Sequence, residues 1–178
     1  MVSVTEGFPP LLGPGARVLV LGSLPSQKSL QKNQYYGHPQ NVFWRIMAEL
    51  FGAGADLAYA DRVAILTQNG IAVWDVLASS VRPGSMDSDI DQKTATANDF
   101  ATLLRENTGI RLVCFNGQAA AKLFDRLVDE QTRQSFSAVD FVTMPSTSPA
   151  YAAMSFAEKL ERWSYVAAVL DPVAGAIR

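Results

Sequence analysis

A segment of eleven residues in the first third of the chain combines side chains that could bind a flat polar ring. Residues 34–44 read Gln-Tyr-Tyr-Gly-His-Pro-Gln-Asn-Val-Phe-Trp and include the only histidine, His38. Tyrosine rings stack on heteroaromatic rings, and amide groups such as that of Asn41 hydrogen-bond their polar edges. The segment follows an apolar run that ends in Gly22 and Ser23. This chemistry suits a nucleobase better than a metal ion or a nucleotide phosphate.

Four polar segments follow the apolar runs that we expect to form strands. They are residues 22–26, 75–77, 116–118 and 145–149. In an open α/β sheet, ligands bind beyond the carboxyl ends of the strands, so these segments are the candidate site. They are rich in Asn, Ser, Thr and Gly and poor in His, Glu and Lys. The sequence therefore predicts a pocket of amides, hydroxyls and aromatic rings.

Several common enzyme classes lack their required residues. A Ser-His-Asp hydrolase would depend on His38 and would need a Gly-x-Ser-x-Gly turn, which does not occur. The Gly-Lys-Ser/Thr of a phosphate-binding loop is also missing, and Gly22 has no partner glycines at dinucleotide-binding spacing. A two-carboxylate glycosidase remains open, although most of its candidate acids resemble caps and turns in a solvated loop. Those acids are Asp75, Asp87, Asp89 and Asp91.

Composition and length favour one globular domain in the cytoplasm. The chain has 178 residues, a net charge of −2 and one cysteine, so an internal disulfide and a four-cysteine metal or iron–sulfur site are excluded. No segment resembles a signal peptide or a membrane span. A protein with non-specific affinity for DNA is usually basic overall, which this chain is not, so only a small basic face could form. Its candidates are Lys28, Lys32, Arg45, Arg82 and Lys93.

Apolar runs and helical patterns alternate along the chain, which predicts one parallel sheet with helices on both faces. Residues 1–16 are expected to be a leader loop without regular structure, because Pro9, Pro10, Gly13, Pro14 and Gly15 interrupt any regular element. A single domain would cover 17–170, and 171–178 would be a tail. Strands are predicted at 17–22, 71–76, 110–115 and 139–144. Helices are predicted from about 39–41 to 51, at 56–68, from 96–98 to 107, after 117 and from 155, and a polar loop at 81–92.

Taken singly, the polar residues also have ordinary structural roles. Asn41 could be a helix N-cap, and Asn116 could be only a turn residue. Tyr35 and Tyr36 could be plain aromatic packing, and His38 could be a structural hydrogen-bonding group. Their order along the chain favours a functional reading.

Seven segments in order resemble motifs of the uracil-DNA glycosylase superfamily, most of all its hypoxanthine-DNA (deoxyinosine) glycosylase branch. They are residues 22–26, 34–36, 38–44, 74–77, 82–88, 115–117 and 145–149. The resemblance covers about residues 17–170. It implies a three-layer α/β/α sandwich around a four-stranded parallel sheet. It also implies base excision repair by a monofunctional, monomeric glycosylase that acts on DNA with a deaminated base. No cofactor, metal or lyase activity is expected.

The resemblance also assigns roles to individual residues. Asn41 matches the catalytic asparagine, which would place a water molecule, and Asn116 matches the asparagine that reads the base. Tyr35 or Tyr36 would stack on the base, backbone groups near Gly22 and Ser23 would contact it, and His38 would shape the loop. Residues expected to contact DNA are Ser146, Thr147, Ser148, Pro149 and Tyr151.

The sequence departs from the family pattern at three positions, where Gly37, Gln40 and Tyr151 replace an expected Ala, Arg and Asn. No Asp or Glu lies between Gly22 and Trp44, unlike in uracil-DNA glycosylases that activate water with a carboxylate. Three alternatives remain: a uracil-DNA glycosylase acting on G·U pairs, a non-catalytic base- or DNA-binding module, and an α/β ligand-binding protein unrelated to DNA.

Overall fold

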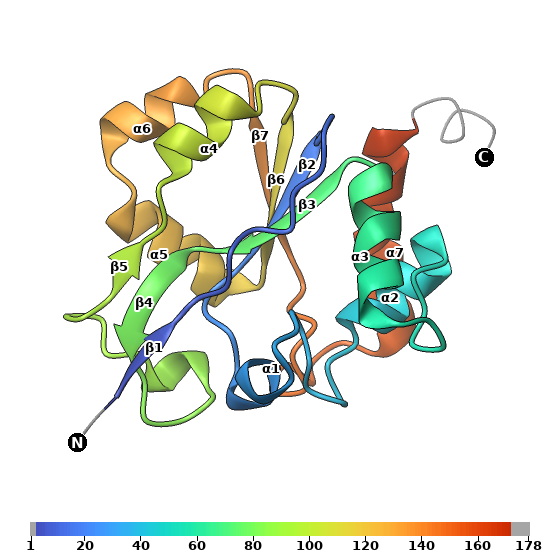
Figure 1. The fold of residues 1–178 in the computed structure, drawn as a ribbon, viewed down its shortest axis with the longest axis horizontal. Coiled ribbons are helices and arrows are strands. Elements are labelled where there is room, and N and C mark those ends of the chain that lie inside the picture. The colour runs from blue at the N-terminus through green and yellow to red at the C-terminus, as the bar shows by residue number, and fades with distance from the viewer. Residues whose placement is uncertain (1–2, 172–178) are drawn as a thin grey trace.

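A four-stranded parallel sheet forms the centre of the protein in a computed structural model that describes residues 3–171 (Figure 1). Its strand order is β3-β2-β6-β7. The strands are β2 (Val18–Gly22), β3 (Ile71–Asp75), β6 (Leu112–Asn116) and β7 (Asp140–Met144). Each predicted strand is present, with its ends moved by one or two residues. All pairings are parallel, which requires crossover connections and accounts for the alternation of strands and helices.

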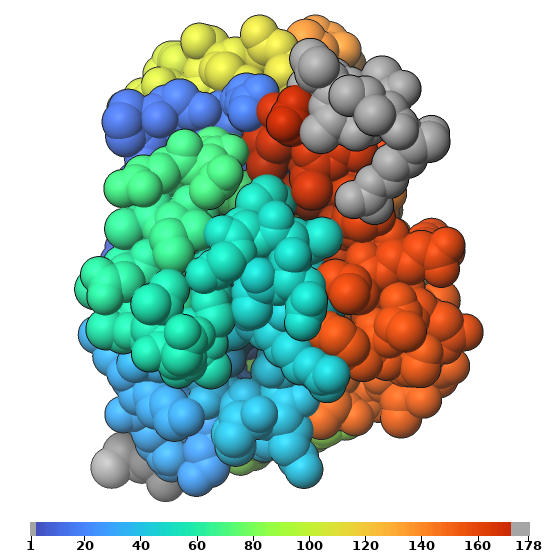
Figure 2. All heavy atoms as spheres, turned by 90° about the vertical axis from the view of Figure 1, so that its right-hand side faces the viewer, coloured from blue at the N-terminus to red at the C-terminus, as the bar shows by residue number. Residues whose placement is uncertain are grey.

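Helices cover both faces of this sheet, which confirms the predicted three-layer architecture. One face carries α2 (Phe43–Phe51), α3 (Tyr59–Gln68) and α7 (Phe156–Leu170). Figure 2 looks onto this side, where the cyan and green helices lie beside the orange-red α7. The other face carries α4 (Phe100–Glu106), α5 (Gln118–Leu127) and α6 (Glu130–Ser135). The short α1 (Gln27–Lys32) follows β2 at the carboxyl end of the sheet.

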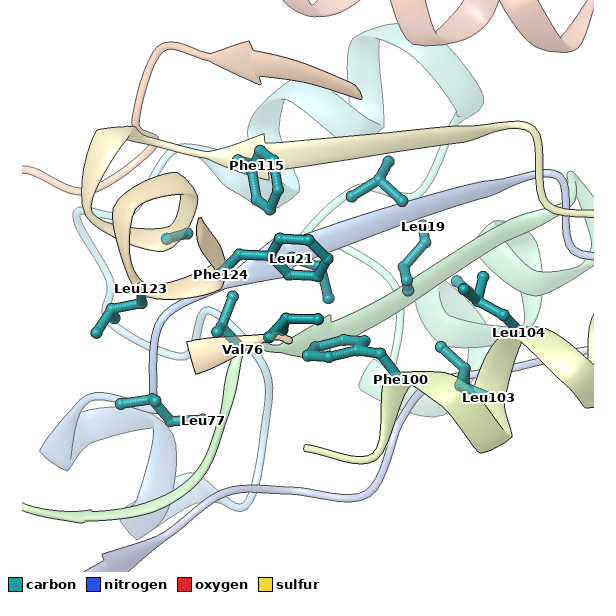
Figure 3. Packing of buried hydrophobic residues seen from close by; sticks show 14 of the residues in the cluster. Leu19, Leu21, Val76, Leu77, Phe100, Leu103, Leu104, Phe115, Leu123 and Phe124 are labelled. Carbon is teal, nitrogen blue, oxygen red and sulfur yellow. The ribbon is translucent and has the colours of Figure 1, made fainter. Parts of the chain in front are cut away.

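Alternating side chains of the strands build two separate cores. Val18 and Val20 of β2 pack with α2 and α7, and Leu19 and Leu21 point to the opposite face. Figure 3 shows this second core, in which Phe124 of α5 lies beside side chains of β2 and β6. Strands buried on both faces are apolar at almost every position, and for that reason their locations could be predicted.

A small antiparallel sheet corrects two predictions. Its order is β1-β4-β5, from β1 (Val4–Glu6), β4 (Leu77–Val81) and β5 (Thr96–Ala97). Residues 1–16 are therefore not a loop throughout, because β1 lies before the first proline, and Leu11 also bridges to Val73. The predicted loop 81–92 begins at the last residue of β4 and contains the 3₁₀ turn η1 (Asp87–Asp89). Short strands with polar positions lack the apolar signal of the central sheet.

Helix ends follow their capping residues. A capping box opens α7, the helix predicted from residue 155: the Ser155 side chain accepts from the Glu158 N–H, and the Glu158 side chain accepts from the Ser155 N–H. The helices α1 and α6 were not predicted, since each has only six residues. No helix within residues 3–171 is long and apolar enough to cross a membrane. Apart from Asp171, the predicted tail lies outside the described residues.

Gly117 is expected to be needed at the turn between β6 and α5. Its φ of +100° with ψ of 165° is a backbone region that side-chain-bearing residues avoid, and a Cβ there would lie 3.0 Å from Ser146 Cβ. We predict that Gly117→Ala lowers the free energy of unfolding by about 1–3 kcal/mol in urea denaturation. Gly52→Ala is the control, because Gly52 has a φ of +77° but open space around it. Equal losses in the two variants would contradict this explanation.

Candidate functional site

Gly22, Asp75 and Asn116 form a row across the carboxyl ends of three central strands, β2, β3 and β6. Gly22 pairs with Asp75 of β3, and Leu21 pairs with Phe115, which precedes Asn116 in β6. All three lie on the sheet face that carries α2 and α7, two residues beyond the buried Val20, Val73 and Cys114. Because Gly22 has no side chain, the carboxyl of Asp75 can lie directly against its backbone.

The Tyr36 hydroxyl reaches this row. A Cβ built on Gly22 would lie 2.5 Å from Asp75 Oδ1 and 3.2 Å from the Tyr36 hydroxyl oxygen, so any larger residue would collide with the carboxyl. Tyr36 has a φ of +53°, and its ring stacks on Phe43 at 4.1 Å between centroids. Burial, and then the charge of Asp75, raise the pKa of Tyr36, while the Asn116 side chain acts in the opposite direction.

Asp75 is an acid in an apolar setting. It is 4% exposed, and its Oδ2 has no hydrogen-bond partner among residues 3–171. Burial, followed by the nearby charge of Asp87, raises its pKa to about 7, and Arg82 opposes this shift. Asp75 can therefore change its charge near neutral pH.

Tyr35 is part of the core instead of the row. It is 3% exposed, and its hydroxyl donates to the backbone oxygen of Pro9 at 3.0 Å. Its backbone N–H donates to the Tyr59 hydroxyl, and its carbonyl accepts from Trp44 Nε1 at 2.8 Å. Of the two predicted stacking residues, only Tyr36 lies beside Asn116.

Asn41 lies immediately before α2. Its side-chain Oδ1 accepts from the Phe43 N–H at 2.9 Å, which fixes the direction of the carboxamide. The N-cap residue of α2 is Val42, so Asn41 is not the N-cap, although its side chain accepts from the first helical N–H. His38 shapes the turn before it, because its Nδ1 accepts from the Gln40 N–H and its carbonyl accepts from the Asn41 N–H.

Thr147 joins the two asparagine segments. Its N–H donates to Asn116 Oδ1, and its hydroxyl accepts from Asn116 Nδ2, both at 2.9 Å. Its carbonyl accepts from the Val42 N–H at 3.0 Å, directly after Asn41. A backbone N–H can only donate, so this bond identifies which end of the Asn116 amide is oxygen. Thr147 is 1% exposed, so its side chain supports the site from the protein interior and does not face solvent.

The loop 145–151 is held at both ends by α7. Trp163 Nε1 donates to the Pro145 carbonyl at 3.0 Å, and the Lys159 ammonium donates to the Tyr151 carbonyl at 2.7 Å. Pro149 and the Tyr151 ring are exposed between these anchors. Ser146 and Ser148 are half-buried, and their hydroxyls accept from backbone N–H groups within the loop.

A second loop braces the residues after β2. Arg82, predicted as a candidate for a basic surface, is 3% exposed, and its guanidinium donates to the carbonyls of Leu24 and Pro25. Ser23 donates its hydroxyl to Asp87, and the Gln27 N–H donates to Ser85. Ser23 therefore faces this loop, whereas Gly22 belongs to the row.

Gly37, one of the departures from the family pattern, lies against α1. Its N–H donates to the Ser29 hydroxyl at 3.0 Å, and a Cβ would lie 3.2 Å from Ser29 Cα. An alanine at this position would be crowded against the helix backbone.

Asp75 lies in one of the predicted strand-end segments, but the sequence interpretation gave it no role in the asparagine-based site. Its signal was an acid at the end of a continuous apolar run, where a strand buried on both faces must carry it into the protein. Grouping it with the solvated Asp89 and Asp91 obscured that position. Among the described residues, no cluster of His, Cys, Asp and Glu could hold a metal ion.

We predict that Thr147→Val frees the Asn116 amide. Valine keeps the shape and the backbone bonds but removes the hydroxyl acceptor, which should lower the free energy of unfolding by about 1–2 kcal/mol. The Asn116 side-chain NH₂ protons should exchange faster with solvent in proton–nitrogen NMR spectra. Thr147→Ser is the control, because it retains the hydroxyl. Unchanged exchange in Thr147→Val would show that this bond does not fix the amide.

Asp75 should make the protein less stable as pH rises. The unfolded carboxyl ionises near pH 4, whereas the folded one holds its proton to about pH 7. The folded state therefore binds more protons between these values, and its free energy of unfolding falls as pH increases. Asp75→Asn should gain stability relative to the parent protein between pH 5 and pH 8, on the order of 1–3 kcal/mol in urea denaturation.

The control for this variant is Asp99→Asn at the N-cap of α4. The Thr102 N–H lowers the pKa of Asp99, so this exposed carboxylate is ionised in both states across the same range. Its substitution should cause no pH-dependent difference above pH 5. A pH-independent difference in Asp75→Asn would contradict a carboxyl that titrates near neutrality.

Comparisons with known proteins identify the family of the chain. Two curated relatives are described as hypoxanthine DNA glycosylases: one from Methanosarcina acetivorans is 41% identical over 120 residues, covering 67% of this chain and 75% of the relative. The other, from Methanosarcina barkeri, is 37% identical over 118 residues, covering 66% and 73%. A solution NMR structure of a candidate uracil DNA glycosylase from M. acetivorans superposes with a TM-score of 0.77 at 34% identity, covering 95% of this chain and 99% of that one. A family model described as Uracil DNA glycosylase superfamily matches residues 9–169, and the chain belongs to that superfamily.

Proposed function

We propose that the protein is a DNA glycosylase that flips a deaminated base out of DNA and hydrolyses its bond to deoxyribose, with hypoxanthine as the main substrate. The observation that carries this proposal is the pair of bonds from Thr147 to Asn116 and to the residue after Asn41, which unites the two asparagines in one site. The curated relatives from Methanosarcina, described as hypoxanthine DNA glycosylases, support the choice of base.

Base recognition would centre on Asn116. Hypoxanthine has a carbonyl acceptor next to an N–H donor, and uracil has the same pair, so an amide edge alone does not separate them. Adenine reverses this pattern, and an Asn116 amide of fixed orientation would reject it. The base would stack on Tyr36, a contact worth roughly 1–3 kcal/mol. Pocket size would then distinguish the bicyclic purine from uracil.

Asn41 would position the attacking water. Its Oδ1 already accepts one hydrogen bond, from the Phe43 N–H, and a carbonyl oxygen has a second lone pair for water. An amide is a poor proton acceptor, so this role is orientation more than proton removal. The bond between the purine N9 and C1′ breaks with its electrons passing to the base, the water oxygen bonds to C1′, and the water proton leaves to the base or to solvent.

The DNA would be contacted by the exposed parts of the loop 145–151. Pro149 and Tyr151 extend between two anchors on α7, which favours a rigid wedge for the space that a flipped nucleotide leaves. Ser146 and Ser148 would approach the backbone beside them. With a net charge of −2, binding would depend on such local contacts more than on long-range attraction.

Release of the base by water would leave an abasic site with its strand intact. The proposed catalytic group is an asparagine, and the row contains no lysine that would form a covalent intermediate. Lys159 donates to the Tyr151 carbonyl and supports the loop. We therefore propose that the enzyme is monofunctional and acts as a monomer.

A base-release panel tests the substrate. Duplexes containing hypoxanthine or uracil opposite each normal base would be incubated with the protein, and strands would be analysed with and without alkali. We expect release of hypoxanthine, with strand breaks only after alkali. Preferred release of uracil from G·U pairs would replace hypoxanthine as the substrate. Binding to abasic DNA without any release would identify a non-catalytic module, and breaks without alkali would indicate lyase activity.

Asn41→Ala tests the catalytic role. We predict that DNA binding is retained and that the single-turnover rate of base release falls at least 100-fold, because the water loses its positioning group. Gln40→Ala is the matched control, as the neighbouring exposed side chain has no assigned step. An unchanged rate in Asn41→Ala, measured with enzyme in excess, would remove Asn41 from the mechanism.

A further inference from the structure

Two buried polar atoms in or beside the row lack hydrogen-bond partners within residues 3–171. They are the hydroxyl oxygen of Tyr36 and Oδ2 of Asp75. A buried polar group without a partner costs free energy, so each such atom needs an explanation. Both side chains reach the same position beside Gly22, within 3.2 Å of where its Cβ would lie. They come from different parts of the chain and meet only because that position has no side chain.

The Asn116 side chain lies next to the Tyr36 hydroxyl. It acts on the Tyr36 hydroxyl in the direction of a hydrogen bond, although the contact falls short of normal hydrogen-bond geometry. The far end of the Asn116 amide is fixed, because Oδ1 accepts from the Thr147 N–H. One N–H of Nδ2 binds the Thr147 hydroxyl, which leaves the second N–H of Nδ2 available for the Tyr36 oxygen.

Two further charged groups, Arg82 and Asp87, act on the pair formed by Asp75 and Tyr36. Arg82, from the loop after β4, attracts the carboxylate, and its guanidinium is held by backbone carbonyls. Asp87 of η1 repels it from the solvent side. The phenols of Tyr36 and Tyr35 also feel the charge of Asp75, and the Tyr35 hydroxyl donates away from the row to Pro9. Tyr36 is thus the phenol of this pair that can act between Asp75 and Asn116.

We propose that Asp75 is a positioning residue that acts through Tyr36 to occupy the second N–H of the Asn116 amide, whose direction Thr147 fixes. In its ionised form, Asp75 accepts a hydrogen bond from the Tyr36 hydroxyl. The Tyr36 oxygen in turn accepts a hydrogen bond from Asn116 Nδ2. This inference rests on the proposed function of the same site. It adds a substrate-discriminating device to a site whose first loop has no carboxylate.

The chain of bonds has one consequence for specificity. With both N–H groups of Nδ2 engaged, Asn116 presents the remaining lone pair of Oδ1 to the base. That lone pair accepts the N1–H of hypoxanthine, whereas adenine has an unprotonated N1 at the same place. When Asp75 is protonated, its carboxyl donates to the Tyr36 oxygen instead, and the hydroxyl proton is directed at Asn116. The second N–H of Asn116 Nδ2 then loses its acceptor, while the two bonds to Thr147 remain, and the preference for hypoxanthine weakens.

A double-mutant cycle with a pH series tests this arrangement. Asp75→Asn, Tyr36→Phe and the double variant would be compared in single-turnover release of hypoxanthine from pH 5.5 to pH 8.5. We expect the parent rate to rise about tenfold through pH 7, and Asp75→Asn to be about tenfold slower at pH 8 with a flat profile. The double variant should be no slower than Tyr36→Phe, because Asp75 acts through Tyr36. Asp140→Asn, at the opposite end of the sheet, should behave like the parent.

A readout in the free protein separates this inference from the proposed function. The side-chain NH₂ signals of Asn116 should shift with pH around 7 in the parent protein, and this shift should disappear in both Asp75→Asn and Tyr36→Phe. If no duplex releases a base but these NMR shifts appear, the proposed function is wrong, and the relay, meaning the hydrogen bonds from Asp75 through Tyr36 to Asn116, is supported. Additive rate losses in the cycle, or an Asn116 titration that persists in Asp75→Asn, would overturn the relay.

Discussion

The absence of a side chain at Gly22 is the constraint on which the site depends. A Cβ at this position would lie 2.5 Å from Asp75 Oδ1 and 3.2 Å from the Tyr36 hydroxyl. Because the strands are parallel and in register, the missing side chain lets the Asp75 carboxyl and the Tyr36 hydroxyl approach each other on the sheet face that also carries Asn116. The apolar strands behind these groups are rigid and exclude water. A buried polar atom without a partner therefore costs more free energy here than it would in contact with solvent.

Thr147 connects this row to the loop before α2. Its backbone and hydroxyl hold Asn116, and its carbonyl holds the N–H that follows Asn41. The helix α7 holds the same loop at both ends, through Trp163 and Lys159. A shift in α7 would therefore move the proposed base-reading residue and the proposed catalytic residue together. This coupling accounts for why a buried threonine lies in a loop that otherwise faces solvent.

The central sheet and its helices could be predicted because long apolar runs and helical spacing are local signals. The small sheet of β1, β4 and β5 could not, because its strands are short and Ser79 and Ser80 interrupt the apolar pattern of β4. The segments of the site were identified by their order, yet contacts decide which residues meet. Tyr36 and Tyr35 are adjacent and chemically alike, and only the fold places one in the row and the other in the core.

The central claim is that Asn116 and Tyr36 receive the flipped base. A crystal structure with duplex DNA containing 2′-fluoro-deoxyinosine tests it most directly, because the fluorine slows bond cleavage by destabilising positive charge at C1′. We predict hypoxanthine outside the helix, with N1 in hydrogen-bond contact with the Asn116 amide and its ring against Tyr36. A flipped base bound elsewhere, with the contacts between Asn116 and Thr147 unchanged and no base beside them, would contradict the account.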